Sequence, residues 1–319
     1  MPIPYVDTTS TAAAGPVVIP PPPPPAPPSV PSVSWTPAGG KRVFLLPGSG
    51  RIDLMHGVDG VDMPPEDQYR TPYPGDGDIY SGRRATGRPM MLPLLVFGPT
   101  YIQQQASRRQ VMTMFDPRRG PGVLSWDMPD GTRRDISALY TGGLESPLNG
   151  HLDKLPLHHM YQVLLHADDP YFLGEEDGFS VGGPEQVDFF PGPPFHISET
   201  NTLGLVTVFI HGEVGAYPTW TLSGPMATAT LTNLDSGESL VLTPSLQAGS
   251  KLIVRTDPRV VASEKFTSST GANRWATTAG QFPSLWPLLP GENNLSITAT
   301  GTAPTSQVEC EYRPRYLTV

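Results

Sequence analysis

The fold is constrained most by residues 155–174, which read LPLHHMYQVLLHADDPYFLG. From Met160 to His166 the side chains alternate, and both alternating sets are largely apolar, which predicts a strand that is buried on both faces or lies between two layers. Pro170 has no amide hydrogen and pushes Asp169 toward an extended conformation, so the strand is expected to end there. We therefore interpret this stretch as the last strand of one domain and the exit toward the next.

Residues that break helices are frequent enough to favour many short elements joined by turns. The chain contains 33 glycines and 40 prolines among 319 residues, well above average usage. Hydrophobic residues make up 38%, which is enough for a sizeable core, and the length suits two domains better than one. The sequence therefore predicts a mainly β fold in two domains, with one short helix in the first.

Charge and hydropathy exclude several function classes. A net charge of -9 and a pI near 5.2 argue against non-specific binding to nucleic acid or to an anionic membrane. The longest apolar run, 90–97, is interrupted by Pro93 and is shorter than the roughly 18 residues that cross a bilayer. The lone Cys310 cannot form an intrachain disulfide, and no signal-peptide pattern begins the sequence, so we expect synthesis in a cytoplasm.

Residues 1–40 are of low complexity and are predicted to form an extended arm. The six prolines Pro20–Pro25 enforce polyproline II, a stiff rod without internal hydrogen bonds, which cannot build a packed core. We interpret the segment as a spacer, a tail or an arm that lies along a neighbouring subunit. A ligand for an aromatic groove is the less favoured alternative.

The segment 41–173 alternates short apolar runs with turn clusters and is predicted to be the first β domain. Apolar runs at 41–46 and 51–55 are each followed by a bend, and 90–97 has strand character. Residues 62–89 are polar and rich in turn residues, and an inert connection of that length is uncommon. We predict a long loop or a hairpin there.

Two local patterns within this domain are well defined. Tyr101–Phe115 is predicted to be a helix capped by Thr100. The residues expected on its apolar face are Ile102, Ala106, Val111 and Met114. Strand-like residues at 122–126 and 132–140 flank Asp130-Gly131, and this pattern predicts a hairpin because Gly tolerates the positive φ of the turn.

The last part of the chain, 197–319, follows an expected linker at 174–196 and shows short strands at regular spacing. Strands are predicted at 203–211, 219–222, 228–234, 240–243, 251–256, 259–262, 284–289, 294–300 and 308–312, with a further strand-like run at 187–190. Strands that recur about every eight to twelve residues are typical of a β-sandwich or jelly roll.

No enzyme template fits the sequence, and no catalytic residue, metal ligand or cofactor is predicted. His158 and His159 lie near Asp168 and Asp169, but adjacent residues of a strand point to opposite faces, and no H-E-x-x-H spacing occurs. Glycine motifs that bind nucleotides are not found either. Cys310 is predicted to be a small core residue.

Two sets of residues are predicted to contact other molecules. Arginine pairs usually lie on solvated surfaces, but they can also provide complementary charge between subunits. The arginines predicted to lie at a subunit interface are Arg108, Arg109, Arg118, Arg119, Arg133 and Arg134. Trp275 and Trp286 could stack on sugar rings, although a buried tryptophan is the commoner case in a sandwich.

Several short motifs follow one another from the helix to the end of the chain. The first half holds GVLSW (122–126), RRDISALY (133–140) and YQVLLHADDPYF (161–172), and the second half holds GEVGAYPTWTLSGP (212–225) and WPLLPGEN (286–293). In this order they resemble the distal tail protein family, also called minor tail proteins, of long-tailed, siphovirus-like phages. The second half is similar to the C-terminal sandwich of tail proteins from phages of actinobacterial hosts.

This resemblance implies a structural virion protein of the tail tip or baseplate, without enzymatic activity. Its N-terminal domain would close a homo-oligomeric six-fold ring under the tail tube, and its galectin-like C-terminal sandwich would project toward the parts that attach to the host. The partners implied are the tail tube protein, tail tip or hub proteins and tail fibre proteins. Residues 62–89 could correspond to the projecting belt hairpin of the family.

Two other functions stay open. The C-terminal sandwich could be a carbohydrate-binding module for a glycan of the host cell surface, with Trp220, Trp275 or Trp286 as stacking residues. A glycan-cleaving enzyme is the least favoured alternative, and it rests only on the many enzymes that are built on β-sandwiches.

Overall fold

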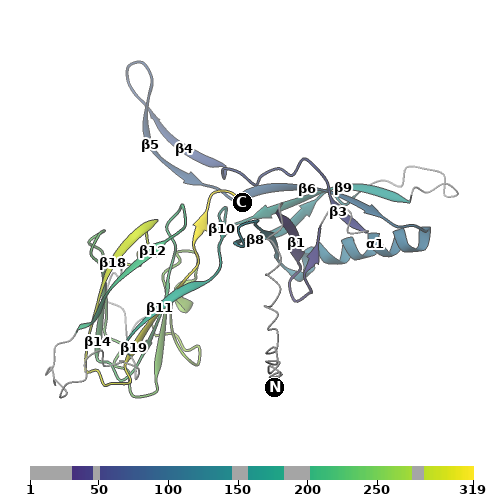
Figure 1. The fold of residues 1–319 in the computed structure, drawn as a ribbon. Coiled ribbons are helices and arrows are strands. Elements are labelled where there is room, and N and C mark those ends of the chain that lie inside the picture. Colours follow the sequence, from purple (N-terminus) through teal and green to yellow (C-terminus); the bar gives the residue numbers. More distant parts are fainter. Residues whose placement is uncertain (1–30, 46–50, 146–156, 183–201, 275–283) are drawn as a thin grey trace, which may run out of the picture.

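A computed structural model describes residues 31–45, 51–145, 157–182, 202–274 and 284–319 of the chain. They form two β-rich domains that lie side by side (Figure 1). The first is a large antiparallel sheet with a helix packed on it, and the second is a sandwich of two smaller antiparallel sheets. The predicted mainly β fold is confirmed.

The first domain is built on a nine-stranded sheet. Its strands, in their order across the sheet, are β2 (Val43–Phe44), β1 (Ser32–Thr36), β7 (Gly122–Asp127), β8 (Arg133–Gly142), β9 (His158–Ala167), β6 (Arg88–Phe97) and β3 (Ile52–Leu54). Two further short strands, β10 (Phe172–Leu173) and β20 (Arg315–Tyr316), join beside β8. The predicted hairpin is β7–β8, and Gly131 in its turn has φ 86°, as the Asp-Gly pattern requires.

Helix α1 (Tyr101–Met114) packs on one face of this sheet and is followed by the 3-10 helix η1 (Pro117–Arg119). Thr100 caps α1 as predicted, because its side chain accepts a hydrogen bond from the Gln103 amide at 3.3 Å. The buried residues of the helix are Gln104, Ser107, Val111 and Met114. Part of the predicted apolar face is wrong, since Ile102 is 80% exposed. The helix is held at its other end, where the Trp35 indole donates to the carbonyl of Met114.

Strand β9 occupies the predicted position and ends at Ala167, but only one of its faces is buried. Tyr161, Val163 and Leu165 lie in the core beneath α1. On the other face, Met160 is 61% and Leu164 is 43% exposed. The expectation of a strand covered on both faces is therefore not met within the described chain.

Residues 62–89 contain the predicted hairpin, formed by β4 (Glu66–Pro72) and β5 (Asp78–Ala85). These two strands make a separate two-stranded sheet, which stands out from the first domain in Figure 1. Almost every residue of the ribbon is exposed. It has no hydrophobic core of its own.

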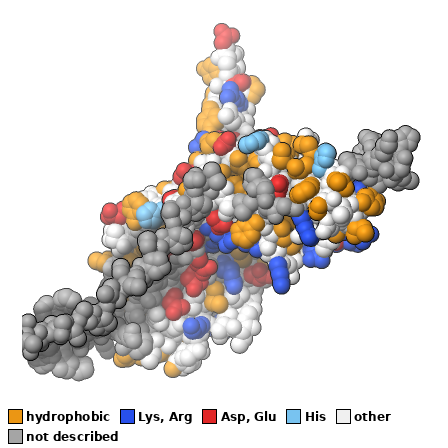
Figure 2. Space-filling model, turned by 45° about the vertical axis from the view of Figure 1, so that its right-hand side comes forward, with side chains coloured by type: hydrophobic (Ala, Val, Ile, Leu, Met, Phe, Trp, Pro, Cys, Tyr) orange, Lys and Arg blue, Asp and Glu red, His pale blue; other side chains and the backbone are white. Residues whose placement is uncertain are grey.

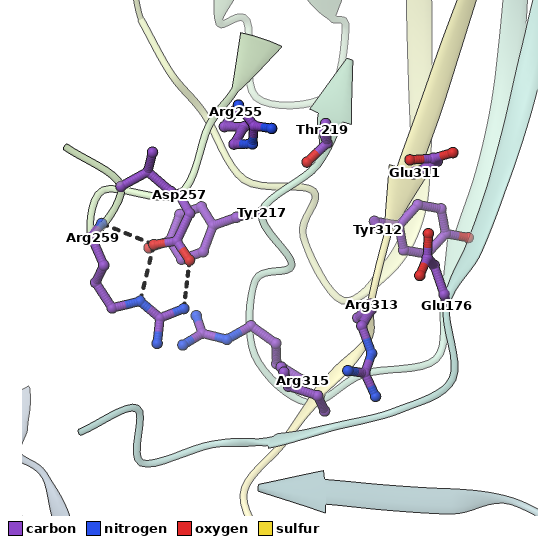
Figure 3. A pocket seen from close by; sticks show the side chains of 12 residues that line it. Glu176, Tyr217, Thr219, Arg255, Asp257, Arg259, Glu311, Tyr312, Arg313 and Arg315 are labelled. Carbon is purple, nitrogen blue, oxygen red and sulfur yellow. Dashed lines mark hydrogen bonds and ion pairs between the residues drawn. The ribbon is translucent and has the colours of Figure 1, made fainter. Parts of the chain in front are cut away.

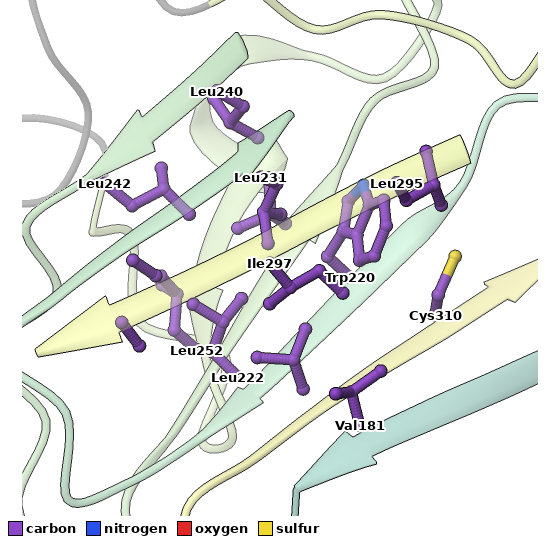
Figure 4. Close-up of a cluster of buried hydrophobic side chains, with 14 of the residues drawn as sticks. Val181, Trp220, Leu222, Leu231, Leu240, Leu242, Leu252, Leu295, Ile297 and Cys310 are labelled. Carbon is purple, nitrogen blue, oxygen red and sulfur yellow. The ribbon is translucent and has the colours of Figure 1, made fainter. Parts of the chain in front are cut away.

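The second domain is a sandwich of a five-stranded and a four-stranded sheet, as predicted. The five-stranded sheet consists of β11 (Asp177–Gly182), β19 (Gln307–Tyr312), β13 (Thr219–Ser223), β16 (Lys251–Arg255) and β17 (Phe266–Ser268). The four-stranded sheet consists of β12 (Thr202–Ile210), β18 (Gly291–Thr300), β14 (Thr228–Asn233) and β15 (Ser239–Leu242). Alternate residues of both sheets meet in one core around Trp220, Leu222, Leu231 and Ile297 (Figure 4).

Two predicted boundaries differ from the structure. The expected arm 1–40 includes β1, which lies in the first sheet with Trp35 only 2% exposed. The expected linker 174–196 includes β11, which pairs with β19 along its whole length. This strand is hard to recognise in the sequence because 174–178 contains acidic residues and glycines, which are uncommon in strands. Its apolar face consists only of Phe179 and Val181.

Two predicted strands of the sandwich are absent from the described residues. Residues 259–262 form a turn that leads into the short helix α2 (Ala262–Lys265), and the next strand is β17. Residues 284–289 are not a regular strand, although Leu288 makes an isolated bridge to Ala216. The strand-like run 187–190 lies outside the described residues.

The C-terminal segment leaves the sandwich and returns to the first domain. Strand β20 pairs with β10, so that Phe172 faces Tyr316 and Leu173 faces Arg315. Figure 1 shows the C-terminus between the two domains. The chain therefore crosses between the domains twice, once at 174–176, between β10 and β11, and once at 313–314, between β19 and β20.

Interdomain junction and candidate assembly surfaces

A cleft of about 310 Å³ lies where the two domains meet. Leu173 and Glu176 line it near the first crossing, and Arg313 and Arg315 line it near the second. Tyr217, Asp257 and Arg259 come from loops of the sandwich, as Figure 3 shows. Cations and carboxylates are thus interleaved along its walls.

Asp169, the second residue after the end of β9, is the carboxylate that joins the two domains. Its Oδ1 accepts a hydrogen bond from Nη2 of Arg315 at 2.7 Å, and its Oδ2 forms an ion pair with Arg259. Arg315 is only 6% exposed and donates a further hydrogen bond to the carbonyl of Gly215 at 3.3 Å. A buried guanidinium with a paired carboxylate is a strong, directional contact.

Aromatic rings complete the surroundings of Arg315. Its guanidinium carbon lies 4.4 Å from the centre of the Tyr171 ring and 5.1 Å from that of Tyr217. The two rings come from different domains. Cation–π contacts of this kind add to the ion pair because both are shielded from water.

Arg259 also binds Asp257 through two hydrogen bonds, of 3.0 Å from Nε and 2.6 Å from Nη2. Burial by itself would raise the pKa of Asp257, but the hydrogen bonds from Arg259 outweigh this effect and the pKa is lowered. The same hydrogen bonds raise the pKa of Arg259. Both groups are therefore charged at neutral pH.

A second group of contacts fixes the returning C-terminal segment. Arg313 donates to Oδ2 of Asp135 at 2.9 Å and to the carbonyl of Gly174 at 2.7 Å. The guanidinium of Arg134 lies 3.5 Å from the centre of the Tyr316 ring. These contacts position one domain against the other, and arginine side chains hold Asp135, Asp169 and Asp257.

Arg88, a fully buried residue of β6, adds a third contact to this segment. It is 1% exposed and donates to the carbonyls of Gly60, Asp62 and Leu317, at 3.0, 2.6 and 2.7 Å. Burial lowers the pKa of Arg88 from its ordinary high value. This side chain ties the base of the β4–β5 hairpin to the C-terminus.

The β4–β5 hairpin is the first of two exposed surfaces that lack a partner within the described chain. Tyr73, Ile79 and Tyr80 are each more than half exposed. Side chains link the two strands through the ion pairs of Arg83 with Glu66 and Arg84 with Asp67 at the base, and through a hydrogen bond of 3.1 Å between the hydroxyls of Thr71 and Ser81. A two-stranded ribbon without a covered apolar face is marginally stable in water.

The outer face of the nine-stranded sheet is the second such surface. Met160, Leu164 and Leu139 are 61%, 43% and 39% exposed and come from two neighbouring strands. Hydrophobic side chains gather on this domain below the projecting hairpin in Figure 2. An apolar sheet face of this kind is typical of a surface that another chain covers.

The six arginines predicted at an interface lie in four environments. Arg133 and Arg134 belong to the junction, where Arg133 donates to Asp135 at 2.8 Å. Arg108 donates to the hydroxyl of Tyr161 at 2.9 Å. Arg118 is paired with Asp116, and this hydrogen bond lowers the pKa of Asp116 to about 2. Arg109 and Arg119 are exposed, with no side-chain partner among the described residues. Their role at a subunit interface stays a prediction.

Of the two tryptophans predicted to stack on sugars, Trp286 is not placed for that role. Trp286 is 2% exposed and packs edge-to-face on Trp220, with ring centres 5.9 Å apart. It belongs to the core of the sandwich and presents no ring to solvent. Trp275 lies outside the described residues. Cys310 is a buried core residue as predicted, and burial raises the pKa of its thiol.

No group of three or more His, Cys, Asp or Glu side chains is placed to hold a metal ion within the described ranges. In the same part of the chain, no helix has the length and apolar character needed to span a membrane.

Residues 211–316 match a family model described as the siphovirus-type tail component, C-terminal domain. A comparison with curated proteins found no match. None of the matches bears on the expected actinobacterial host, which stays a prediction.

Solved structures resemble both domains together. The crystal structure of the Dit (gp 19.1) protein of phage SPP1, a hub of the adsorption apparatus, has a TM-score of 0.60 at 14% identity over 89% of this chain and 98% of that chain. A chain of the phage P2 baseplate in its activated conformation with calcium has a TM-score of 0.51 at 8% identity, over 91% of this chain and 100% of that chain. The chain thus has the two-domain fold of a siphovirus distal tail protein, and its C-terminal domain belongs to the siphovirus-type tail component family.

Proposed function

We propose that the chain is a structural virion protein at the distal end of a phage tail, where six copies form a ring that joins the tail tube to the host-recognition apparatus. The match of residues 211–316 to the tail-component family carries this proposal. In this role the protein is made in the host cytoplasm, assembles with tail tube, hub and fibre proteins, and catalyses no reaction.

The two unpartnered surfaces of the first domain supply the contacts between copies. The hairpin gains stability when its exposed Tyr73, Ile79 and Tyr80 are covered. The sheet face around Met160 and Leu164 is an apolar surface of matching chemistry. Because the two surfaces differ, their pairing is head-to-tail and closes a ring when the rotation per subunit is a simple fraction of a turn.

Light scattering of the full-length protein, combined with electron microscopy, tests this proposal. We expect a particle of six times 34.4 kDa, with six-fold class averages. The variants Tyr73→Ser with Tyr80→Ser, and separately Met160→Ser with Leu164→Ser, should shift the population toward monomer. Both sets replace exposed apolar groups, so folding should be retained, which circular dichroism checks.

A matched control is Val241→Ser, which removes an apolar group of similar exposure (55%) from the sandwich. It should leave the ring intact. A protein that stays monomeric at concentrations of tens of micromolar and is missing from purified tails would contradict the proposed function. A ring that survives both variant sets would instead place the contacts on other surfaces.

A further inference from the structure

Strand β12 is an edge strand of the four-stranded sheet and pairs only with β18 among the described residues. The pairing is in continuous register from Gly204, opposite Ile297, to Ile210, opposite Gly291. No other main-chain hydrogen bond is made by residues 203–210 in the described chain. One side of a regular strand thus has amide and carbonyl groups that no described residue pairs with.

The residues whose main chain points away from β18 can be identified. Asn294, opposite Thr207, directs its carbonyl to the amide of Leu234 and its amide to Asp235, on the side away from β12. Opposed residues of an antiparallel pair either both face each other or both face away. Thr207 therefore directs its amide and carbonyl to the free edge, and Leu205 and Phe209 do the same, two residues to either side.

Other edges in the sandwich are protected, and β12 is not. Strand β15 has four residues and is followed by Pro244, β17 has three residues, and β11 begins with Asp177 and holds two glycines. Natural sheets use short strands, charges, prolines and bulges to keep edges from pairing. Residues 203–210, LGLVTVFI, contain no charge and no proline, and the one irregularity of register precedes Gly204.

The side chains beside this edge are apolar. Leu205 and Phe209 are 72% and 57% exposed on the outer face of the sheet. Val206 and Val208 are half-buried and pack against the core. A strand added here would form hydrogen bonds to three residues and would cover both exposed side chains.

We propose that the free edge of β12 binds an extended strand of another tail protein by β-strand addition. The partner segment has apolar side chains at alternate positions, next to Leu205 and Phe209, and a main chain that pairs with Thr207. A second copy is not the occupant, because two copies that pair through the same edge are related by a twofold axis between them, and neighbouring copies of a six-fold cyclic ring are not related in that way. This last step rests on the proposed function.

Hydrogen–deuterium exchange of the peptide covering 203–210 tests the proposal, in the purified full-length protein and in tails isolated from virions. The amides of Leu205, Thr207 and Phe209 should exchange fast in the purified ring and at least about tenfold more slowly in tails. Thr207→Pro, which removes the outward amide together with the hydrogen bond that the Thr207 hydroxyl donates to Asn294 at 2.7 Å, should be incorporated into tails and abolish this protection. Phe209→Lys should do the same by adding a charge, and Val241→Lys on β15 is the matched control.

Three results would overturn the proposal, and they have different meanings. Fast exchange in tails that contain the protein shows that nothing pairs with β12, while the proposed function stands. Protection that is already present in the purified protein would show that another part of this chain pairs with β12. If that protection depends on protein concentration, a second copy pairs with β12. Absence of the protein from tails removes the proposed function and this inference with it.

Discussion

Oδ1 of Asp169 lies 2.7 Å from Nη2 of Arg315, although the two residues are 146 positions apart and all strands of the sandwich lie between them in the sequence. Asp169 sits at the predicted boundary between the domains, so the connection is clamped there by an ion pair. The clamp includes Arg259 on the same carboxylate and the two tyrosine rings beside Arg315. These few side chains therefore set the orientation of the sandwich relative to the sheet.

Asp169→Asn is expected to destabilise the protein. The variant leaves the guanidinium of Arg315, only 6% exposed, without its counter-charge, and breaking one side of a buried ion pair costs about 3–5 kcal/mol. Urea denaturation should show the loss, and small-angle scattering should show a wider distribution of domain orientations. Asp116→Asn, in the pair with the exposed Arg118, is the control, and it should lower stability much less and leave the distribution of domain orientations unchanged. Equal stability of Asp169→Asn and wild type would show that the domains are oriented by other contacts.

Stability is expected to fall at acidic pH because of the junction carboxylates. Burial alone would raise the pKa of Asp135, but hydrogen bonds from Ser125, Arg313 and Arg133 outweigh it, and the pKa is lowered in the folded protein. A lowered pKa contributes stability that is complete above the ordinary Asp value of about 3.9 and is lost as pH falls through the folded value.

Thermal unfolding between pH 7 and pH 2.5 checks this expectation. The melting temperature should be flat above about pH 5 and should drop below pH 4. Asp135→Asn, which lacks the titrating group, should melt lower at neutral pH and drop less on acidification. A drop of the same size in wild type and Asp135→Asn would mean that other carboxylates control acid unfolding.

Elements with a strong local pattern were predictable from the sequence. Strand β9 alternates over ten residues, helix α1 has the Thr100 cap, and the β7–β8 turn has Asp130-Gly131. In each case residues close in sequence determine the conformation. Strands β1 and β11 were missed for the opposite reason, because they are short, lie in proline-rich or acidic segments, and are fixed by pairing with β7 and β19 far along the chain.

The junction could not be predicted for a similar reason. The sequence does show Asp169 before a proline and Asp257 two positions before Arg259, but nothing local indicates that Arg259 and Arg315 converge on Asp169. Arginine pairs drew attention to Arg133 and Arg134, which turn out to contact Asp135 and Tyr316 of the same chain. Adjacent arginines in a sequence indicate only a local positive charge, whereas the tertiary fold determines which side chain each arginine contacts.

Trp286→Ala is expected to act on stability, in contrast to the sugar-stacking role predicted from the sequence. The ring is buried against Trp220, and truncating a buried tryptophan costs roughly 3–5 kcal/mol. Denaturant unfolding followed by tryptophan fluorescence measures the effect. Trp286→Phe keeps an aromatic ring in the core and should recover part of the loss. A variant of wild-type stability would contradict the buried position.

Alanine substitutions at two glycines with positive φ distinguish the cost of backbone strain from the cost of a steric clash. Gly143, beside the irregular pairing of β8 with β9, has φ +94°, and a Cβ there would lie 1.7 Å from the carbonyl oxygen of Gln162. Gly131 has φ +86° with nothing within 4 Å of such a Cβ. Gly131→Ala should therefore lower the free energy of unfolding by roughly 1–2 kcal/mol, the cost of the left-handed conformation alone. Gly143→Ala should cost clearly more, because strands β8 and β9 must also separate. Equal losses for the two variants in urea denaturation would mean that the backbone at Gly143 relaxes without disturbing the β8–β9 pairing.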